Sequence, residues 1–323
     1  MSTLFIGMPV CNGERFIAGS LDTLKSQSFA DWTLLISDNH STDSTQAICQ
    51  EYCNNDGRIK YHRQTENIGA INNFRFLLEH ANAPYFMWAA ADDIWDKSFV
   101  EACINGLNLN PQAGLAFTNI VNVDSFGRVI REYPSFNRFV NSSQHLSIAR
   151  FILDPEQLGK ANLIYGVYKL ASLKQFMIQF LESPEACHAT ADMAFNLGIL
   201  CRTRLYIDER VLFMKRYVKS TDSPARLDRS TTVARYFNGV KRQEEFASYK
   251  QAIAAACRGT QFEDLVNFLI GYRERLNIDI GQVIEENKRG LLTSRKYRIG
   301  EVVLAPLSLL KKCIVLLRSR LGR

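Results

Sequence analysis

Short apolar stretches alternate with amphipathic ones along the first hundred residues. The apolar stretches have the length of buried strands, and the amphipathic ones repeat apolar residues three and four apart, as a helix covering a sheet does. We expect strands at 3–10, 32–37, 58–63 and 85–90, and helices at 15–27, 41–53 and 71–80. This alternation predicts an α/β fold with a mostly parallel, doubly wound (Rossmann-like) central sheet flanked by helices.

The order of elements changes after residue 99. We expect helices at 99–109, 173–181 and 189–201, strands at 115–123, 162–170, 205–207 and 211–218, and a helical or irregular stretch at 138–158. From 229 to 276 the pattern is helical again. The chain therefore divides into a domain over 1–222, a helical C-terminal extension over 223–300 and a basic amphipathic tail over 301–323.

Two adjacent carboxylates, Asp92 and Asp93, follow the fourth expected strand directly. Adjacent carboxylates at the end of an apolar strand are costly unless something neutralises them. A divalent cation does so, and hard oxygen ligands select Mg²⁺ or Mn²⁺. The alternative is structural, with Asp93 or Asp96 capping a helix that begins near Lys97.

Other polar residues also follow expected strands. Asn12 and Asp38 come after the first two, and ligands bind beyond the carboxyl ends of such strands, so these residues should converge with the acid pair. Asp38 suits a base or ribose, or alternatively a turn. Asn67-Ile68-Gly69 precedes a helix and allows close approach of an anion, or is a plain turn. Asp192 lies in the first turn of a helix, where an acid usually compensates the dipole.

The net charge of +6 is mostly a C-terminal feature. Residues 288–323 hold ten basic side chains and one acidic one, Glu301, so the rest of the chain is close to balanced. The tail 301–323 alternates apolar runs with basic residues, which suits a helix lying in a membrane interface or one packed on a second subunit. Basic residues without interleaved aromatics argue against a nucleic-acid partner.

The N-terminus and the cysteines indicate the compartment. The opening residues 1–10 lack a basic segment and a long apolar segment, so we expect a first strand rather than a signal peptide. No uninterrupted apolar run is long enough to predict a spanning helix. Eight scattered cysteines form no metal-binding pattern and are expected to be reduced. We therefore expect a cytoplasmic protein, peripheral on the cytoplasmic face of the membrane.

Taken together, the segments resemble glycosyltransferase family 2. The start Pro9–Ile17, the run Ser37–Thr45, the turn Asn67-Ile68-Gly69 and the motif Asp92-Asp93-Ile94-Trp95 follow that family in order and spacing. The last motif resembles the D-D-I-W of O-antigen and lipopolysaccharide sugar transferases. The chain departs from the family pattern at Cys11, where many relatives carry tyrosine, at Asn39 and His40, which replace a second acid and a glycine, and at Ala91, which replaces the first acid of the motif Ala91-Asp92-Asp93.

The resemblance implies a GT-A fold, with a nucleotide-sugar-binding half over 1–124 and an acceptor half over 125–222. It implies an inverting transfer from a nucleotide-diphosphate sugar to a hydroxyl of a saccharide or lipid-linked saccharide, in cell-surface polysaccharide or lipopolysaccharide synthesis. Asp192 would be the general base, Asp93 would ligate Mn²⁺ or Mg²⁺, and Lys215–Ser220 resembles a basic loop that closes over the diphosphate. The residues that would hold the donor are Pro9, Val10, Cys11, Glu14, Asp38, Asn67, Asp92 and Asp93.

Two other functions fit part of the pattern. A non-catalytic nucleotide-sugar-binding protein would use the same pocket without depending on Asp192. A sugar nucleotidyltransferase uses a similar sheet and metal, but it normally carries a glycine-rich basic loop after the first strand. Here that loop, Cys11–Arg15, contains a single glycine, which argues against this class.

Overall fold

A computed structural model describes residues 2–154, 158–187, 191–217 and 240–275 of the chain. Contacts group Met1–Glu274 into one compact unit. The boundary expected at residue 222 and the tail 301–323 lie outside the described residues.

The alternation expected in the first hundred residues is confirmed. Parallel pairing joins β1 to β2 and to β4, and β2 to β3, so these four strands form one half of the sheet. β1 is buried on both faces, as a strand covered by helices on each side must be. The elements of this half are β1 (Leu4–Val10), α1 (Ile17–Lys25), β2 (Trp32–Asp38), α2 (Thr45–Asn55), β3 (Ile59–Arg63), α3 (Ala70–His80) and β4 (Tyr85–Trp88).

The second half extends the same sheet with mixed directions, in the order β3-β2-β1-β4-β8-β6-β9-β5. β8 is antiparallel to both β4 and β6, whereas β9 runs parallel to β6. The short strand β7 pairs only with β6 and forms a hairpin with it. The elements are β5 (Ile94–Trp95), α4 (Phe99–Leu109), β6 (Ala113–Val123), β7 (Val129–Glu132), η1 (Phe136–Phe139), α5 (Gln144–Leu153), η3 (Lys160–Tyr165), β8 (Val167–Lys169), α6 (Leu170–Glu182), η4 (Pro184–Cys187), α7 (Ala191–Leu200), β9 (Arg204–Arg216) and α9 (Val240–Cys257).

The strand expected at 162–170 is wrong for most of its length. Residues 160–165 form the 3₁₀ helix η3, and only the three residues of β8 are extended. The hydroxyl of Tyr168 donates to the carbonyl oxygens of Leu163 and Ile164, which satisfies the end of that helix. Gly166 lets the chain approach β6 closely, since an added Cβ would lie 2.7 Å from the Ala116 carbonyl oxygen.

The two short strands expected at 205–207 and 211–218 are one long strand, β9. The polar residues 208–210 separated the two expected strands, but β9 continues through this point with shifts in its register to β6. The Asn119 side chain donates to the Glu209 carbonyl oxygen at 2.6 Å and so completes the irregular ladder. Because β9 does not turn here, its end at Arg216 reaches the carboxyl end of β6.

The start of the second helix also differs from the expectation. α2 begins at Thr45 after Ser44, not after Ser41 or Thr42. The Ser41 hydroxyl accepts from the Asn12 backbone N–H at 2.8 Å, so it holds a neighbouring loop instead of capping the helix.

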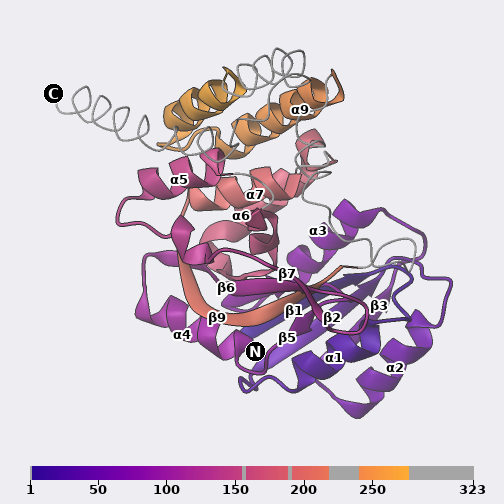
Figure 1. Ribbon diagram of the computed structural model, residues 1–323. Helices are drawn as coiled ribbons and strands as arrows, with labels where there is room; N and C mark the ends of the chain where they lie inside the picture. The colour runs from indigo at the N-terminus through magenta and orange to yellow at the C-terminus, as the bar shows by residue number, and fades with distance from the viewer. Residues whose placement is uncertain (1, 155–157, 188–190, 218–239, 276–323) are drawn as a thin grey trace, which may run out of the picture. The chain divides into compact units, whose positions relative to one another are not determined.

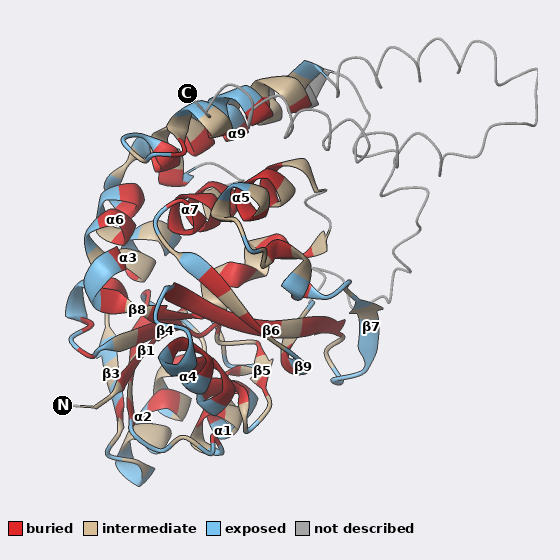
Figure 2. Cartoon of the chain, turned by 90° about the vertical axis from the view of Figure 1, so that its left-hand side faces the viewer, coloured by how far each residue is buried: buried red, intermediate tan, exposed pale blue. Residues whose placement is uncertain are grey.

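Helices cover both faces of the sheet (Figure 1). α1, α2 and α4 lie on one face, and α3 and α6 pack together on the other. The core between these layers is rich in aromatic rings, and Trp88 packs edge-on against Phe86, Tyr168 and Phe195. Burial follows this layering, with the strands and the inward helix faces buried (Figure 2).

The described part of the C-terminal extension is helical and belongs to the same unit. α9 packs against α7, and residues 263–275 form a further helix. In the described ranges, no helix combines the length and the apolar character needed to cross a bilayer.

Candidate functional site

The loops after β1 and β2 are tied to each other by reciprocal hydrogen bonds. The side-chain oxygen of Asn12 accepts from the Thr42 backbone N–H at 2.8 Å, while the Gly13 N–H donates to the Thr45 hydroxyl at 2.8 Å. Asn12 and His40 both have positive φ, 53° and 62°, which asparagine and histidine tolerate better than bulkier side chains. The two motifs that suggested a nucleotide pocket therefore also build a clamp that fixes the edge of the sheet.

Glu14 takes part in this clamp. Its carboxylate accepts from the Ser44 N–H at 2.9 Å, and its own N–H donates to Asp43 at 3.1 Å. Asp43 in turn accepts from the Thr45 N–H, and these bonds lower the pKa of its carboxyl group despite some burial. The structure thus gives Glu14, predicted to line the donor pocket, a definite role in holding the two loops together.

Pro9, Val10 and Cys11 lie where β1 meets this clamp. Val10 is buried, Pro9 is half-buried and Cys11 is exposed. Gly13 must lack a side chain because an added Cβ would lie 2.6 Å from a Val10 methyl group. Of the three, Cys11 presents its side chain to the solvent side of the edge.

Asp38 ends β2 with a fully buried carboxylate. One oxygen accepts from the Ser41 N–H at 2.9 Å and the other from the Tyr61 hydroxyl at 2.6 Å. Burial and this bond raise the pKa of Tyr61 above its usual value. Asp38, predicted to line the donor pocket, therefore has no exposed surface, and Tyr61, which sequence reasoning missed, is its hydrogen-bond partner.

Asn67 lies in an exposed loop that reaches back to the end of β2. Its side-chain oxygen accepts from the Asn39 amide at 2.8 Å and from the Gly69 N–H at 3.0 Å. The Asn39 oxygen accepts from the Ile68 N–H at 2.8 Å, so both ends of the Asn39 side-chain amide are bonded to this loop. Gly69 has a φ of 82°, which a side chain would strain.

Asp92 and Asp93, adjacent in sequence, have opposite environments. Asp93 is fully buried, and its two oxygens accept from the Lys215 ammonium and from the Arg216 backbone N–H, each at 2.9 Å. Burial raises the pKa of Asp93 to about 6, against the lowering effect of Lys215. Asp92 is half-buried, and its carboxylate makes no hydrogen bond or ion pair with any other residue in the described part of the chain.

The end of β9 supplies the cations of this site. Burial alone would lower the pKa of Lys215, but Tyr165, Asp93 and Asp92 outweigh it and raise that pKa. The Lys215 ammonium lies 4.6 Å from the centre of the Tyr165 ring. Lys215 was expected in a basic loop closing over the diphosphate, and the structure instead places it in a strand, facing the acid pair.

Arg216 also faces inward. Its guanidinium donates to the Asp92 carbonyl oxygen at 2.9 Å and to the Asp124 and Ser125 carbonyl oxygens of the β6–β7 turn, and it lies 4.8 Å from the centre of the Phe16 ring. It therefore joins three loops of the edge. The sequence signal that could have suggested this is the alternation of side chains in the strand expected at 211–218.

A divalent metal can be tested against these side chains. Asp93, the expected ligand, has no exposed surface, and both of its oxygens already have donors. This geometry does not fit Asp93 as the metal ligand. Asp92 has the free carboxylate that a metal shared with substrate phosphates requires. Among the described residues, no three His, Cys, Asp or Glu side chains gather where they could hold one metal ion.

Asp192 lies in the first turn of α7. One of its oxygens accepts from the Met193 N–H at 2.7 Å, which fits the dipole of a helix start. Burial raises the pKa of its carboxyl group. α7 packs on η3, which carries Tyr165. The Tyr165 ring contacts Lys215, which pairs with Asp93, so these contacts connect α7 to the acid pair.

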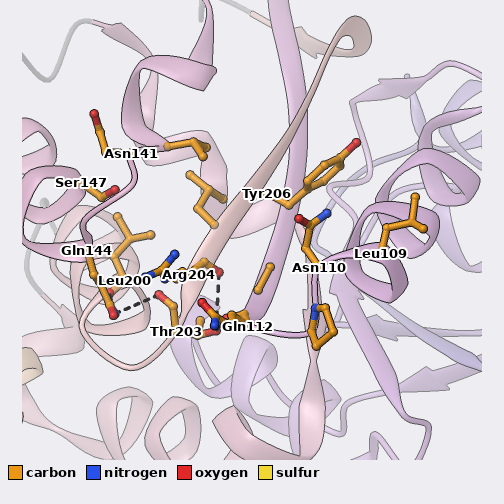
Figure 3. A pocket seen from close by; sticks show the side chains of 14 residues that line it. Leu109, Asn110, Gln112, Asn141, Gln144, Ser147, Leu200, Thr203, Arg204 and Tyr206 are labelled. Carbon is orange, nitrogen blue, oxygen red and sulfur yellow. Dashed lines mark hydrogen bonds between the residues drawn. The ribbon is translucent and has the colours of Figure 1, made fainter.

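A separate cavity lies at the other end of β6, away from these residues (Figure 3). It is bounded by the end of α4, the start of β6 and the start of β9. The Gln144 amide within it donates to the Leu200 and Thr203 carbonyl oxygens, so this group is already engaged. The cavity contains none of the predicted site residues.

Comparisons with known proteins agree with this geometry. The family model for glycosyl transferase family 2 matches residues 5–169, just over half of the chain. The glucosyltransferase WfgD of Escherichia coli, named for transfer from UDP-Glc to α-D-GlcNAc-diphosphoundecaprenol, is 31% identical over 98 residues, which cover 30% of this chain and 38% of WfgD. The teichoic acid poly(glycerol phosphate) polymerase of Staphylococcus epidermidis is 33% identical over 94 residues, covering 29% and 13%.

The fold has solved counterparts as well. The Staphylococcus aureus TarS fragment 1–349, solved with UDP-GlcNAc, superposes with a TM-score of 0.60 at 15% identity, over 83% of this chain and 70% of that one. The sheet and its helices are thus those of the GT-A glycosyltransferases, as expected. The matched segments span less than half of the length of the two curated relatives. With its family model and fold in agreement, this chain belongs to glycosyl transferase family 2.

Proposed function

We propose that this chain is an inverting glycosyltransferase that moves a sugar from a nucleotide-diphosphate sugar to an acceptor hydroxyl in the synthesis of a cell-surface polysaccharide. The observation that carries the proposal is half-buried Asp92 at the carboxyl edge of the sheet, whose carboxylate has no hydrogen-bond or ion-pair partner in the described part of the chain. It lies near the clamped loop after β1, which leaves Cys11 exposed, and Asn67 is exposed in the loop after β3. Family membership and the structures solved with nucleotide sugars support this donor class.

Asp92, rather than Asp93, would hold Mn²⁺ or Mg²⁺ together with the diphosphate oxygens. Such an ion supplies positive charge that stabilises a departing diphosphate. The protein keeps Asp92 in place through Arg216, which holds its carbonyl oxygen at 2.9 Å.

Asp192 would take the proton from the attacking hydroxyl. A general base works best when its pKa approaches the working pH, and burial moves the pKa of Asp192 in that direction. In the described part of the chain the Met193 N–H donates to one of its oxygens, and lone pairs on the other remain for a hydroxyl. A single displacement assisted by this base would invert the anomeric centre.

The acceptor and the compartment belong to the same proposal. WfgD is named for a diphosphoundecaprenol-linked acceptor. A lipid-linked saccharide would require the enzyme at a membrane surface, with its donor on the cytoplasmic side. The basic tail 301–323 would provide that peripheral contact.

Donor hydrolysis is the direct test. The purified protein is incubated with a panel of nucleotide sugars and Mn²⁺ or Mg²⁺, beside the Asp92→Asn and Asp192→Asn proteins. We expect one donor to release its nucleoside diphosphate, with metal dependence that Asp92→Asn abolishes. Donor-induced thermal stabilisation in all three proteins, without turnover by wild type even when saccharide acceptors are added, would instead identify a binding protein.

A further inference from the structure

The single ammonium group of Lys215 lies near two adjacent carboxylates. Its distance to Asp93 is 2.9 Å, and the charge of Asp92 also contributes to raising its pKa. Only one of the two carboxylates has Lys215 as its ion-pair partner. The carboxylate that pairs with Lys215 is occupied, and the other one stays free for a ligand.

The structure settles this choice by burial and by the backbone. The Arg216 N–H donates to the second oxygen of Asp93 at 2.9 Å, so β9 presents two consecutive donors to that one carboxylate. The Ser20 hydroxyl donates to the Asp93 carbonyl oxygen at 2.7 Å and fixes the backbone from α1. A buried carboxylate without a cation is strongly destabilising, so Asp93 holds Lys215 more strongly than half-buried Asp92 can.

We propose that Asp93 is a positioning residue which captures the Lys215 ammonium and thereby keeps the neighbouring Asp92 carboxylate free for its ligand. The expected effect on ligand binding rests on the proposed function of Asp92, but the pairing of Lys215 with Asp93 does not. Without Asp93, Lys215 would turn to Asp92, the other carboxylate whose charge acts on its ammonium group, and would compete there with a cation.

A mutant cycle tests the pairing without metal or donor. Urea unfolding is measured for wild type, Asp92→Asn, Asp93→Asn and the double variant. We expect Asp92→Asn to leave the midpoint unchanged or raise it in wild type, and to lower it in the Asp93→Asn background, where Asp92 has become the partner of Lys215. Equal shifts in both backgrounds overturn the proposal.

Mn²⁺ binding tests the consequence. Free Mn²⁺ is followed by electron paramagnetic resonance, with the ion alone and with UDP, GDP or CDP. Partners that orient a metal ligand change affinity by about 10- to 100-fold, and we expect a loss of that size in Asp93→Asn. Asp93→Asn/Lys215→Met, which replaces the ion pair with a neutral pair, should recover most of the affinity because no ammonium remains to occupy Asp92.

The double variant also separates the alternatives. If its Mn²⁺ binding stays lost, Asp93 is itself a ligand and the proposal is overturned. If wild type binds no Mn²⁺ while the urea cycle is non-additive, the pairing stands and the metal role of Asp92 fails. Should Asp93→Asn alone not fold, retained Mn²⁺ binding by the neutral pair still supports the inference, and its loss still overturns it.

Discussion

At the scale of single residues, carboxylates that are adjacent in sequence have different environments. Asp92 and Asp93 share a motif, yet one is half-buried and free and the other is fully buried and paired. Asp192 is a third case, an acid at a helix start whose burial raises its pKa. The environment of each carboxylate therefore decides its chemistry.

Replacing Asp192 by asparagine should separate activity from stability. Loss of a general base costs about 10²- to 10⁴-fold in rate, and we expect kcat to fall within that range. The melting temperature should stay the same or rise, because the fold disfavours the ionised carboxyl group. Asp264→Asn, an exposed acid in the first turn of the helix 263–275, is the matched control and should change neither.

The pH dependence should report the same group. The folded-state pKa of Asp192 is raised above 3.8, so its protonated form is favoured by folding and its stabilising share is lost as pH rises through the raised value. Activity should change in the opposite sense and rise with pH over that range, because the base must be ionised. A kcat/KM profile flat down to the ordinary carboxylate range would contradict this assignment.

At the scale of elements, the loops after β1 and β2 act as one unit. Hydrogen bonds from Asn12, Gly13 and Glu14 cross to the loop before α2. The same residues carry the family resemblance, so much of that motif serves the architecture of the edge. β9 then closes the edge from the other half, through Lys215 and Arg216.

Substitutions at Asn12 can separate two contributions to the stability of this clamp, the hydrogen bond that Asn12 accepts and its backbone conformation. Asn12→Ala removes the acceptor for the Thr42 N–H and places alanine at a positive φ, which costs about 1–2 kcal/mol for the backbone alone. Asn12→Gly removes only the acceptor. We expect both to raise the donor KM, and alanine to lower the free energy of unfolding more than glycine does. Equal unfolding energies would show that the backbone conformation contributes nothing.

At the scale of the whole molecule, the described part of the extension is built into the catalytic unit. An added Cβ at Gly198 of α7 would lie 2.3 Å from the Phe176 ring and 3.1 Å from Ala256 of α9. Cys201 and Cys257 also meet there, with their sulfur atoms 3.5 Å apart. The extension therefore supports α7, which carries Asp192.

This packing predicts opposite effects for two glycine substitutions. Gly198→Ala should destabilise by about 1–3 kcal/mol through overpacking. Gly19→Ala, in α1 with nothing within 4 Å, should stabilise by about 0.5–1 kcal/mol because alanine favours a helix. Urea unfolding measures both. A stabilised Gly198→Ala protein would mean that α7 and α9 are not in close contact.

The sequence by itself determined what local pattern controls. The four alternations of strand and helix, the clustering of Asn12, Asp38 and the acid pair at one edge, and the family all follow from periodicity and from motifs contained in short segments. Errors arose where distant contacts override local preference, as in η3, where Tyr168 completes a helix, and in β9, which continues along β6 through the polar residues that separated two expected strands.

Only the tertiary structure decided which carboxylate of the pair is free. Lys215 lies 122 positions from Asp93 in the chain, and no local pattern links them. The pairing arises because β9 runs the full length of β6 and delivers its last residues to the carboxyl edge. Charge neutralisation inside a protein depends on which groups burial brings together, and sequence order does not contain that information.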